Sequence, residues 1–134
     1  PGYRSMISKK MEAALNAQLN MELYSAYTYA ALAAHFDTID LDGFKHWMLI
    51  QAKEELAHAA KFYAFIMDAG GVVSLDTIKK PTDKYKTPLA VFEAVYKHEC
   101  DVSQSIHALV DLANAEHHHP SHTFLQWFVT EQVE

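Results

Sequence analysis

Apolar residues recur every three or four positions along three long segments of the sequence, and this spacing is typical of amphipathic helices. The first segment spans about residues 8–35 and the second about residues 42–68. The third opens at Thr87 and Pro88, an N-cap residue followed by proline in the first turn, and a fourth begins around Ser121. With only four glycines and four prolines, the chain lacks the frequent turns of a sandwich or barrel. The pattern predicts an all-α protein.

The bulk composition predicts a single globular domain over residues 1–134. Half of the residues are apolar and 12% are aromatic, so a chain of this length can bury a sizeable core. The formal net charge of −6 argues against binding to nucleic acid. No apolar run approaches the roughly 20 residues that a membrane span needs, so no membrane partner is expected.

The single cysteine, Cys100, excludes a framework of internal disulfide bonds and fits a reducing compartment. We therefore expect a cytoplasmic protein in which Cys100 is an ordinary helix residue. The first ten residues, PGYRSMISKK, lack the apolar stretch of a signal peptide. The first five of them are compatible with an addition in front of a natural start at Met6.

The lengths of the connections predict how the helices are arranged. The first and last connections are short, so each is expected to join antiparallel neighbours. The middle connection, residues 72–88, contains two prolines and no helical period. When extended it spans roughly 55 Å, whereas a helix of about 27 residues is roughly 40 Å long. We therefore predict an up-down-down-up four-helix bundle with a long crossover between helices two and three.

Charged residues interrupt the apolar spacing near the middle of three helices. Glu22 lies on the first helix, Glu55 and His58 lie one turn apart on the second, and Glu99 lies on the third. One such residue alone is most often a boundary residue or a satisfied histidine. Three carboxylates at one depth, with no Lys or Arg on the same faces, must share protons at raised pKa or bind a cation. Oxygen ligands with one imidazole favour iron or manganese over zinc or copper.

The fourth helix has two alternative buried faces, and periodicity does not choose between them. The alternatives are Phe124, Trp127, Glu131 and Glu134 on one face, or Leu125, Phe128 and Gln132 on the other. The sequence stops at Glu134, within this pattern. We expect either that the natural chain continues or that this is a truncated form.

At these residues the sequence resembles a ferritin of the non-haem prokaryotic type. The resemblance covers almost everything from Ile7 onward. The segments that carry it are LNMELYSAYTY (19–29), GFKHWMLIQAKEELAHA (43–59), YKHECDVSQSIHALVDLA (96–113) and FLQWFVTEQVE (124–134). Ferritin-like bundles hold a pair of metal ions between their helices by bridging carboxylates.

The resemblance implies a role for each matching position of the paired iron site. It makes Glu55 the carboxylate that bridges two irons, with Glu22 and His58 holding one iron. It makes Glu99 the ligand of the other iron. Tyr29 matches a tyrosine that adjoins this centre, so the resemblance includes it among the catalytic residues.

Further positions match accessory residues of the family. Gln132 matches a glutamine near the second iron. Glu54, Glu131 and Glu134 match a third iron site that some members carry. Trp127 matches a tryptophan that supplies electrons.

The chemistry implied by the resemblance is iron storage and detoxification with ferroxidase activity. Two Fe(II) ions bind per subunit, dioxygen is reduced to peroxide, and Fe(III) moves inward to form a mineral. The cofactor is then iron without haem, the substrates are ferrous iron and dioxygen, and the protein is a homo-oligomer that forms a 24-subunit cage.

The sequence departs from the ferritin pattern at its end. A glutamate directly after Glu134, the rest of helix four and a short fifth helix are absent, and these parts bear on the second iron and on closure of the shell. A rubrerythrin-like peroxidase or a bacterioferritin is the nearest alternative, but both carry a second Glu-x-x-His where this chain has EQVE at 131–134. A metal-free helical interaction module is the alternative of another class, and it takes up no Fe(II).

The remaining histidines need no part in this chemistry. We expect His98 and His107 at the surface, and His35 and His46 at the boundary of the core. The loop before the fourth helix contains His117, His118, His119 and His122. We expect this loop cluster to be solvated or to form a subunit contact, although it is also able to catch zinc or nickel.

Overall fold

The structure is a computed structural model that describes residues 7–82 and 84–133, with side chains up to residue 131. It contains four α-helices and, over the described residues, no β-strand. The bounds of the helices are α1 Lys9–Thr38, α2 Asp42–Asp68, α3 Pro88–Ala115 and α4 His119–Val133. The prediction of an all-α protein is confirmed.

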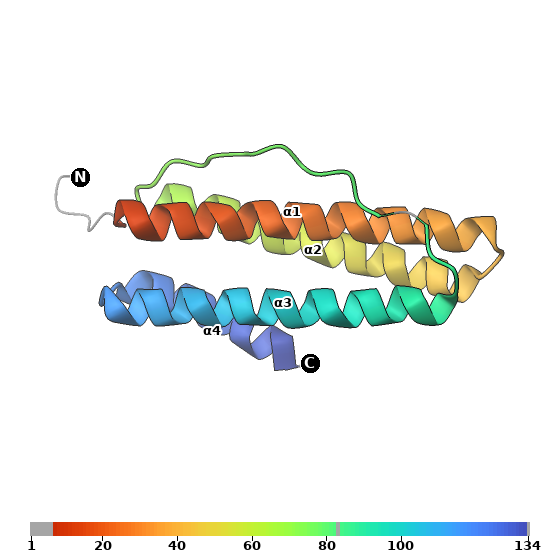
Figure 1. Cartoon of the computed structure of the whole chain (residues 1–134). Helices are drawn as coiled ribbons and strands as arrows, with labels where there is room; N and C mark the ends of the chain where they lie inside the picture. Colours follow the sequence, from red (N-terminus) through yellow and green to blue (C-terminus); the bar gives the residue numbers. More distant parts are fainter. Residues whose placement is uncertain (1–6, 83, 134) are drawn as a thin grey trace.

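The helices form two antiparallel pairs, α1 with α2 and α3 with α4 (Figure 1). Between the pairs the crossover, residues 70–87, runs along the outside of the bundle beside α1 and returns the chain to the end at which α2 begins (Figure 1). Helix α3 is therefore parallel to α2. The predicted up-down-down-up arrangement with a long crossover is confirmed.

Side-chain caps fix the first turns of α3 and α4. Thr87 Oγ1 accepts a hydrogen bond from the Ala90 N–H at 3.1 Å, which confirms the predicted N-cap of α3. Helix α4 begins at His119, two residues before the predicted start at Ser121. The reason is an imidazole cap, because His118 Nδ1 accepts from the Ser121 N–H at 3.2 Å.

Two asparagines of α1 bind the crossover as if they were a neighbouring strand. Asn16 Nδ2 donates to the Val72 carbonyl oxygen at 2.9 Å, and Asn16 Oδ1 accepts from the Ser74 N–H at 2.7 Å. One turn later, Asn20 Nδ2 donates to the Ser74 carbonyl oxygen at 2.9 Å and Asn20 Oδ1 accepts from the Asp76 N–H at 2.9 Å. These side-chain amides satisfy backbone groups that no strand pairs, which is how a long connection without secondary structure stays ordered.

The apolar core consists of two clusters that lie at opposite ends of the bundle. The first is built around Met11, Leu15, Leu19, Phe62, Ile66, Ile106 and Phe128, and the second around Tyr29, Leu32, Phe36, Met48 and Val91. The residues of α1 and α2 that lie between the two clusters include buried polar ones, namely Glu22, Ser25, Glu55 and His58. The core is therefore divided by a polar layer at mid-height.

The buried faces of α2 and α4 differ in part from the sequence pattern. Phe44, one turn before the buried Met48 of α2, keeps the apolar spacing but is 42% exposed, since it lies at the end of the bundle against Phe36, with ring centroids 5.3 Å apart. In α4 the structure selects the second alternative, because Leu125 is 0% and Phe128 1% exposed whereas Trp127 is 41% exposed. Over the described residues, no helix is long and apolar enough to cross a membrane.

Candidate metal centre

Glu22 of α1 and the pair Glu55 and His58 of α2 converge in the polar layer of the core. Their exposed fractions are 1%, 5% and 8% respectively. His58 Nδ1 lies 3.6 Å from Oε2 of Glu22 and 3.6 Å from Oε2 of Glu55. One ligand atom from each of the three residues lies within 4.8 Å of the others. We call these three residues the buried triad.

Helical spacing and small neighbours place the buried triad. Glu55 and His58 are three residues apart, so their side chains leave α2 on the same side. Ala52 and Ala59 are buried one turn before and one turn after Glu55, and Ala26 is buried one turn after Glu22 on α1. Because alanine occupies little volume, the facing surfaces of α1 and α2 leave room between them for the larger polar side chains.

Protonation of the buried triad is set by the contacts among its members. Burial disfavours the ionised form of Glu22, but His58, Glu55 and a 3.1 Å hydrogen bond from Gln18 Nε2 outweigh it and lower the pKa of Glu22. Burial raises the pKa of Glu55 to about 8, and the Glu22 carboxylate adds to this rise. Burial opposes the charge on His58, but the two carboxylates outweigh it and raise its pKa to about 10. Near neutral pH, Glu22 is therefore anionic, Glu55 carries a proton and His58 is a cation.

Two oxygens of the buried triad lack the hydrogen bonds that buried oxygens normally accept. Glu22 Oε2 and Glu55 Oε2 are both inaccessible to solvent and accept no hydrogen bond. Unsatisfied buried acceptors of this kind are rare and costly. Both oxygens face the same imidazole nitrogen, so a divalent cation bound among the three atoms satisfies both of them. Two carboxylates and one imidazole suit iron or manganese.

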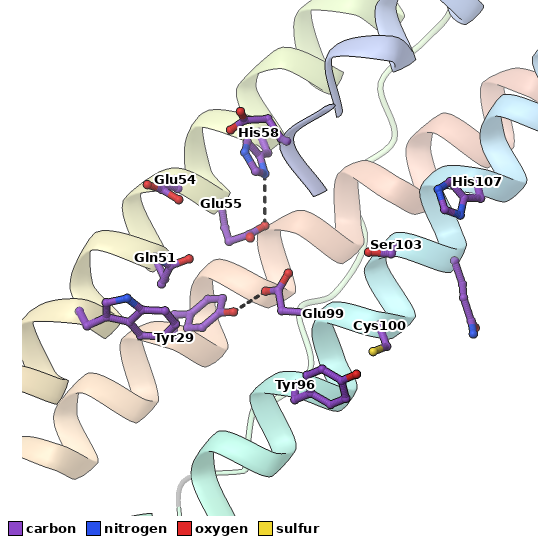
Figure 2. A pocket seen from close by; sticks show the side chains of 13 residues that line it. Tyr29, Gln51, Glu54, Glu55, His58, Tyr96, Glu99, Cys100, Ser103 and His107 are labelled. Atoms are coloured by element: carbon purple, nitrogen blue, oxygen red, sulfur yellow. Dashed lines mark hydrogen bonds and ion pairs between the residues drawn. The ribbon is translucent and has the colours of Figure 1, made fainter. Parts of the chain in front are cut away.

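Glu99 lies across the bundle on α3 and does not belong to the buried triad. Its Oε1 accepts a hydrogen bond from the hydroxyl of Tyr29, which is 2% exposed (Figure 2). Burial and the neighbouring Glu99 carboxylate raise the pKa of Tyr29, so the phenol stays neutral and remains a donor. Glu99 itself is half-buried. Of the three carboxylates expected at one depth, Glu22 and Glu55 are therefore buried in the core, whereas Glu99 is partly exposed.

The reason for the exposure of Glu99 is a large cavity on one side of the buried triad. The cavity has a volume of about 860 Å³ and is lined by residues of all four helices, among them Glu55, His58 and Glu99. Figure 2 shows Gln51, Glu54, Glu55 and His58 of α2 on one side of it and Tyr96, Glu99, Cys100, Ser103 and His107 of α3 on the other. Glu55, His58 and Glu99 thus border one space, whereas Glu22 lies behind them and does not line it.

The residues expected to form a third iron site are only partly accounted for by the structure. Glu54 is exposed and Glu131 is half-buried, and both line the cavity. Neither of them belongs to the buried triad. The side chain of Gln132 and the whole of Glu134 lie outside the described residues.

Trp127 of α4 covers the imidazole of His58. The two ring centroids lie 5.4 Å apart at 83°, and Phe128 contacts the same imidazole with centroids 5.6 Å apart. The Lys61 ammonium lies 4.5 Å from the centre of the indole ring. Two aromatic rings of α4 therefore pack edge-on against the metal-ligating histidine candidate.

Three polar residues near the centre form hydrogen bonds that the sequence did not predict. Gln18 is 4% exposed and binds Glu22, and its position one turn before Glu22 on the same face is a signal that was available. His98 was expected at the surface, and this is wrong, because it is half-buried with Nε2 2.5 Å from Ser25 Oγ. Ser25 and His98 are 73 positions apart, so no local pattern pairs them.

The other histidines do not form a second metal group. His107 is exposed, as expected, and it lines the cavity, whereas His46 is exposed and not at the boundary of the core. His35 is half-buried, as a boundary residue. In the loop cluster, His117 and His119 are exposed and His118 and His122 are half-buried. Among the described residues, only the buried triad brings three metal-ligand atoms together.

Comparison with known proteins identifies the family. The model of the ferritin family, described as a ferritin-like domain, matches residues 12–134. The chain is 40% identical over 129 residues to a bacterial non-haem ferritin of Bacteroides fragilis, which covers 96% of this chain and 81% of the relative. It is 41% identical to a bacterial non-haem ferritin of Staphylococcus epidermidis, over 96% of this chain and 78% of the relative.

Among solved structures, the fold matches an open-pore ferritin from the hyperthermophilic archaeon Archaeoglobus fulgidus. The TM-score is 0.93 at 48% sequence identity, over 95% of this chain and 77% of the archaeal chain. The relatives named are non-haem ferritins, so the rubrerythrin-like and bacterioferritin alternatives are not favoured. A family match over most of the chain, a shared fold and a buried group able to hold a metal agree, and the chain belongs to the ferritin family.

Proposed function

We propose that this ferritin stores iron by oxidising Fe(II) with dioxygen at a di-iron centre inside the bundle and keeping the Fe(III) as a mineral. The observation that carries the proposal is the buried triad, with its two unpartnered oxygens and its imidazole within one ion's reach. A storage protein must bind iron before oxidising it, and these ligands suit iron. Residues 1–134 form one ferritin-like di-iron domain on this proposal.

Each residue of the centre has a distinct task in binding the substrate. Glu22 and His58 hold one Fe(II), Glu55 bridges to a second Fe(II), and Glu99 holds the second ion from α3. Each ion gives one electron to dioxygen. Anionic oxygen ligands stabilise Fe(III) more than Fe(II), so the bound ions are easier to oxidise than ions in solution.

His58 and Glu55 must lose their protons before they can bind the ions. His58 and Glu55 carry protons near neutral pH, and both must lose them to act as ligands. Tyr29 remains protonated and holds Oε1 of Glu99, which leaves the other carboxylate oxygen of Glu99 for the metal. Tyr29 is the catalytic residue nearest to the second ion on this proposal.

Accessory residues extend the centre toward the cavity. Gln132 stands near the second ion, and Glu54, Glu131 and Glu134 hold a third ion. The position of Glu54 and Glu131 on the cavity wall beside Glu55 supports this assignment. Trp127 supplies electrons, and its contact with the His58 ring gives them a short path.

The mineral is held in a homo-oligomer, for which we propose the 24-subunit cage of the family, without haem and in the cytoplasm. Large apolar side chains on the outer surface support subunit contacts. Tyr27 is 54%, Leu56 53% and Leu75 62% exposed, on α1, α2 and the crossover respectively. A chain that stayed monomeric would leave these surfaces in water.

Stopped-flow oxidation of Fe(II) in air tests the proposal. We expect rapid oxidation that saturates at about two Fe(II) per chain before slower mineral growth. Oxidation no faster than in buffer alone overturns the ferroxidase assignment. Native mass spectrometry tests the assembly separately, since a dimer in place of a mass near 24 chains overturns the cage.

A further inference from the structure

We propose that Ser25 and His98 form a positioning pair that fixes the rotation of α3 and so directs Glu99 toward the second iron. The proposal rests on the function proposed above, because Glu99 is given its role there. Neither residue touches iron in this assignment. They act through the backbone of α3, on which His98 directly precedes Glu99.

The hydrogen bond between the pair has a defined direction. Ser25 is 0% exposed, and its hydroxyl donates to the Met21 carbonyl oxygen at 3.0 Å. A serine hydroxyl has one proton, so Oγ can only accept at its second contact. That contact is His98 Nε2 at 2.5 Å. With the Ser25 proton on the Met21 carbonyl oxygen, the Nε2–H tautomer of His98 donates across the interface between α3 and α1.

Two consecutive residues of α3 form hydrogen bonds to side chains of α1. His98 binds Ser25, and Glu99 binds Tyr29, which lies one turn further along α1. Consecutive side chains of a helix point about 100° apart. A rotation of α3 about its axis therefore lengthens or strains at least one of the two bonds. Helix α3 packs more extensively on α4 than on α1, and these two bonds join it to α1 directly beside Glu99.

Packing alone does not hold the His98 ring. A second cavity of about 120 Å³ lies beside it, lined by residues of α1, α3 and the crossover that include Tyr24, Thr28 and Tyr85. This volume exceeds the roughly 30 Å³ that one water molecule occupies in the liquid. The ring of Tyr24 meets the imidazole only edge-on, with centroids 6.3 Å apart. Without Ser25 Oγ, the ring has space to turn away.

Anaerobic titration of the full chain with Fe(II), followed by calorimetry, tests the pair. The variants are Ser25→Ala, which removes the acceptor, and His98→Leu, which removes the donor. We expect the first ion to bind as in the parent and the second to bind about tenfold more weakly, the effect of losing one buried hydrogen bond. The double variant should be no weaker than either single variant, because both remove the same bond.

A conservative variant and a matched control distinguish loss of the positioning pair from a general loss of structure. His98→Gln keeps an N–H donor near the place of Nε2 and should restore binding of the second ion. Ser105→Ala is the matched control, since the hydrogen bond that the Ser105 hydroxyl donates stays within its own helix, to the Asp101 carbonyl oxygen at 3.0 Å. Circular dichroism verifies that each variant remains folded.

The outcomes are distinguishable from failure of the proposed function. If the parent binds no pair of ions, the di-iron proposal fails. If the parent binds two ions and both single variants bind them equally well, the positioning pair is refuted while the di-iron proposal stands. Loss of both ions together in a folded variant, or no rescue by His98→Gln, also refutes it.

Discussion

Glu22 and Glu55 approach one imidazole from two antiparallel helices, each with its Oε2 atom 3.6 Å from Nδ1 of His58. Neither oxygen accepts a hydrogen bond, although both are inaccessible to solvent. Such a pair of carboxylates in the core is tolerated without metal because one holds a proton and the histidine is charged. The same arrangement becomes a ligand set as soon as those protons leave.

Binding of a metal ion to the triad should release protons. Near pH 7 we expect about two protons per first ion, one from Glu55 and one from His58, because both must be deprotonated to coordinate. Zn²⁺ serves as a redox-inert probe, and an indicator dye in weak buffer measures the release. Apparent affinity should rise with pH until the pKa values of about 8 and about 10 are passed. Affinity that is independent of pH from 6 to 8 contradicts this assignment.

Removal of a triad ligand should abolish rapid oxidation without unfolding the protein. Glu22→Ala and His58→Ala should each slow Fe(II) oxidation by at least about 100-fold, since even residues that merely orient ligands contribute 10- to 100-fold. Helix content should stay near normal. Glu93→Ala and His46→Ala are matched controls at exposed positions of α3 and α2. Unimpaired oxidation in both triad variants shows that the centre is elsewhere.

The metal-free protein should lose stability as the pH rises. The pKa values of Glu55 and His58 are raised in the folded state, so each contributes stability that is complete below its ordinary pKa of 4.5 or 6.5. That stability is lost as the pH rises through about 8 and about 10. Thermal unfolding in the presence of a chelator measures this. Glu55→Gln imitates the protonated carboxyl, so its melting temperature should fall less over the same range.

Loss of an asparagine side chain that binds the crossover should release the crossover from α1. Asn16→Ala leaves the Ser74 N–H and the Val72 carbonyl without their partners, and we expect a loss of about 1–3 kcal/mol in the free energy of unfolding. Chemical denaturation measures the loss. Asn114→Ala, at an exposed position of α3, is the control.

Trypsin reports the same change in the crossover more locally. Cleavage after Lys79 should become faster in Asn16→Ala and in Asn20→Ala than in the parent, because the segment that precedes this lysine is no longer fully bound to α1. Equal cleavage rates in the parent and in both variants mean that the crossover is held by other contacts.

The bundle and the triad could be predicted from the sequence because both depend on local spacing. Glu22, Glu55 and His58 stand in the middle of long apolar faces, and the length of the crossover leaves one arrangement for the helices. The buried face of α4 could not be chosen in this way, because it depends on the stacking of Phe62 against Phe128 at 4.4 Å, a contact between helices.

The surroundings of Glu99 could not be predicted for a similar reason. Its partial exposure depends on the cavity that all four helices line, which is a property of the assembled bundle. The contact between Ser25 and His98 joins positions 73 residues apart, and periodicity assigned His98 to the surface because it lies off the apolar face of α3. Spacing predicts which face of a helix is buried, but not which polar residues at its edge find a partner.

Crystals soaked anaerobically in Fe(II) and measured at the iron absorption edge test the centre most directly. We predict an anomalous peak within ligand distance of Glu22 Oε2, Glu55 Oε2 and His58 Nδ1, and a second peak between Glu55 and Glu99. Iron that binds only at other places, with no peak at the triad, contradicts the assignment of this site and the function proposed from it.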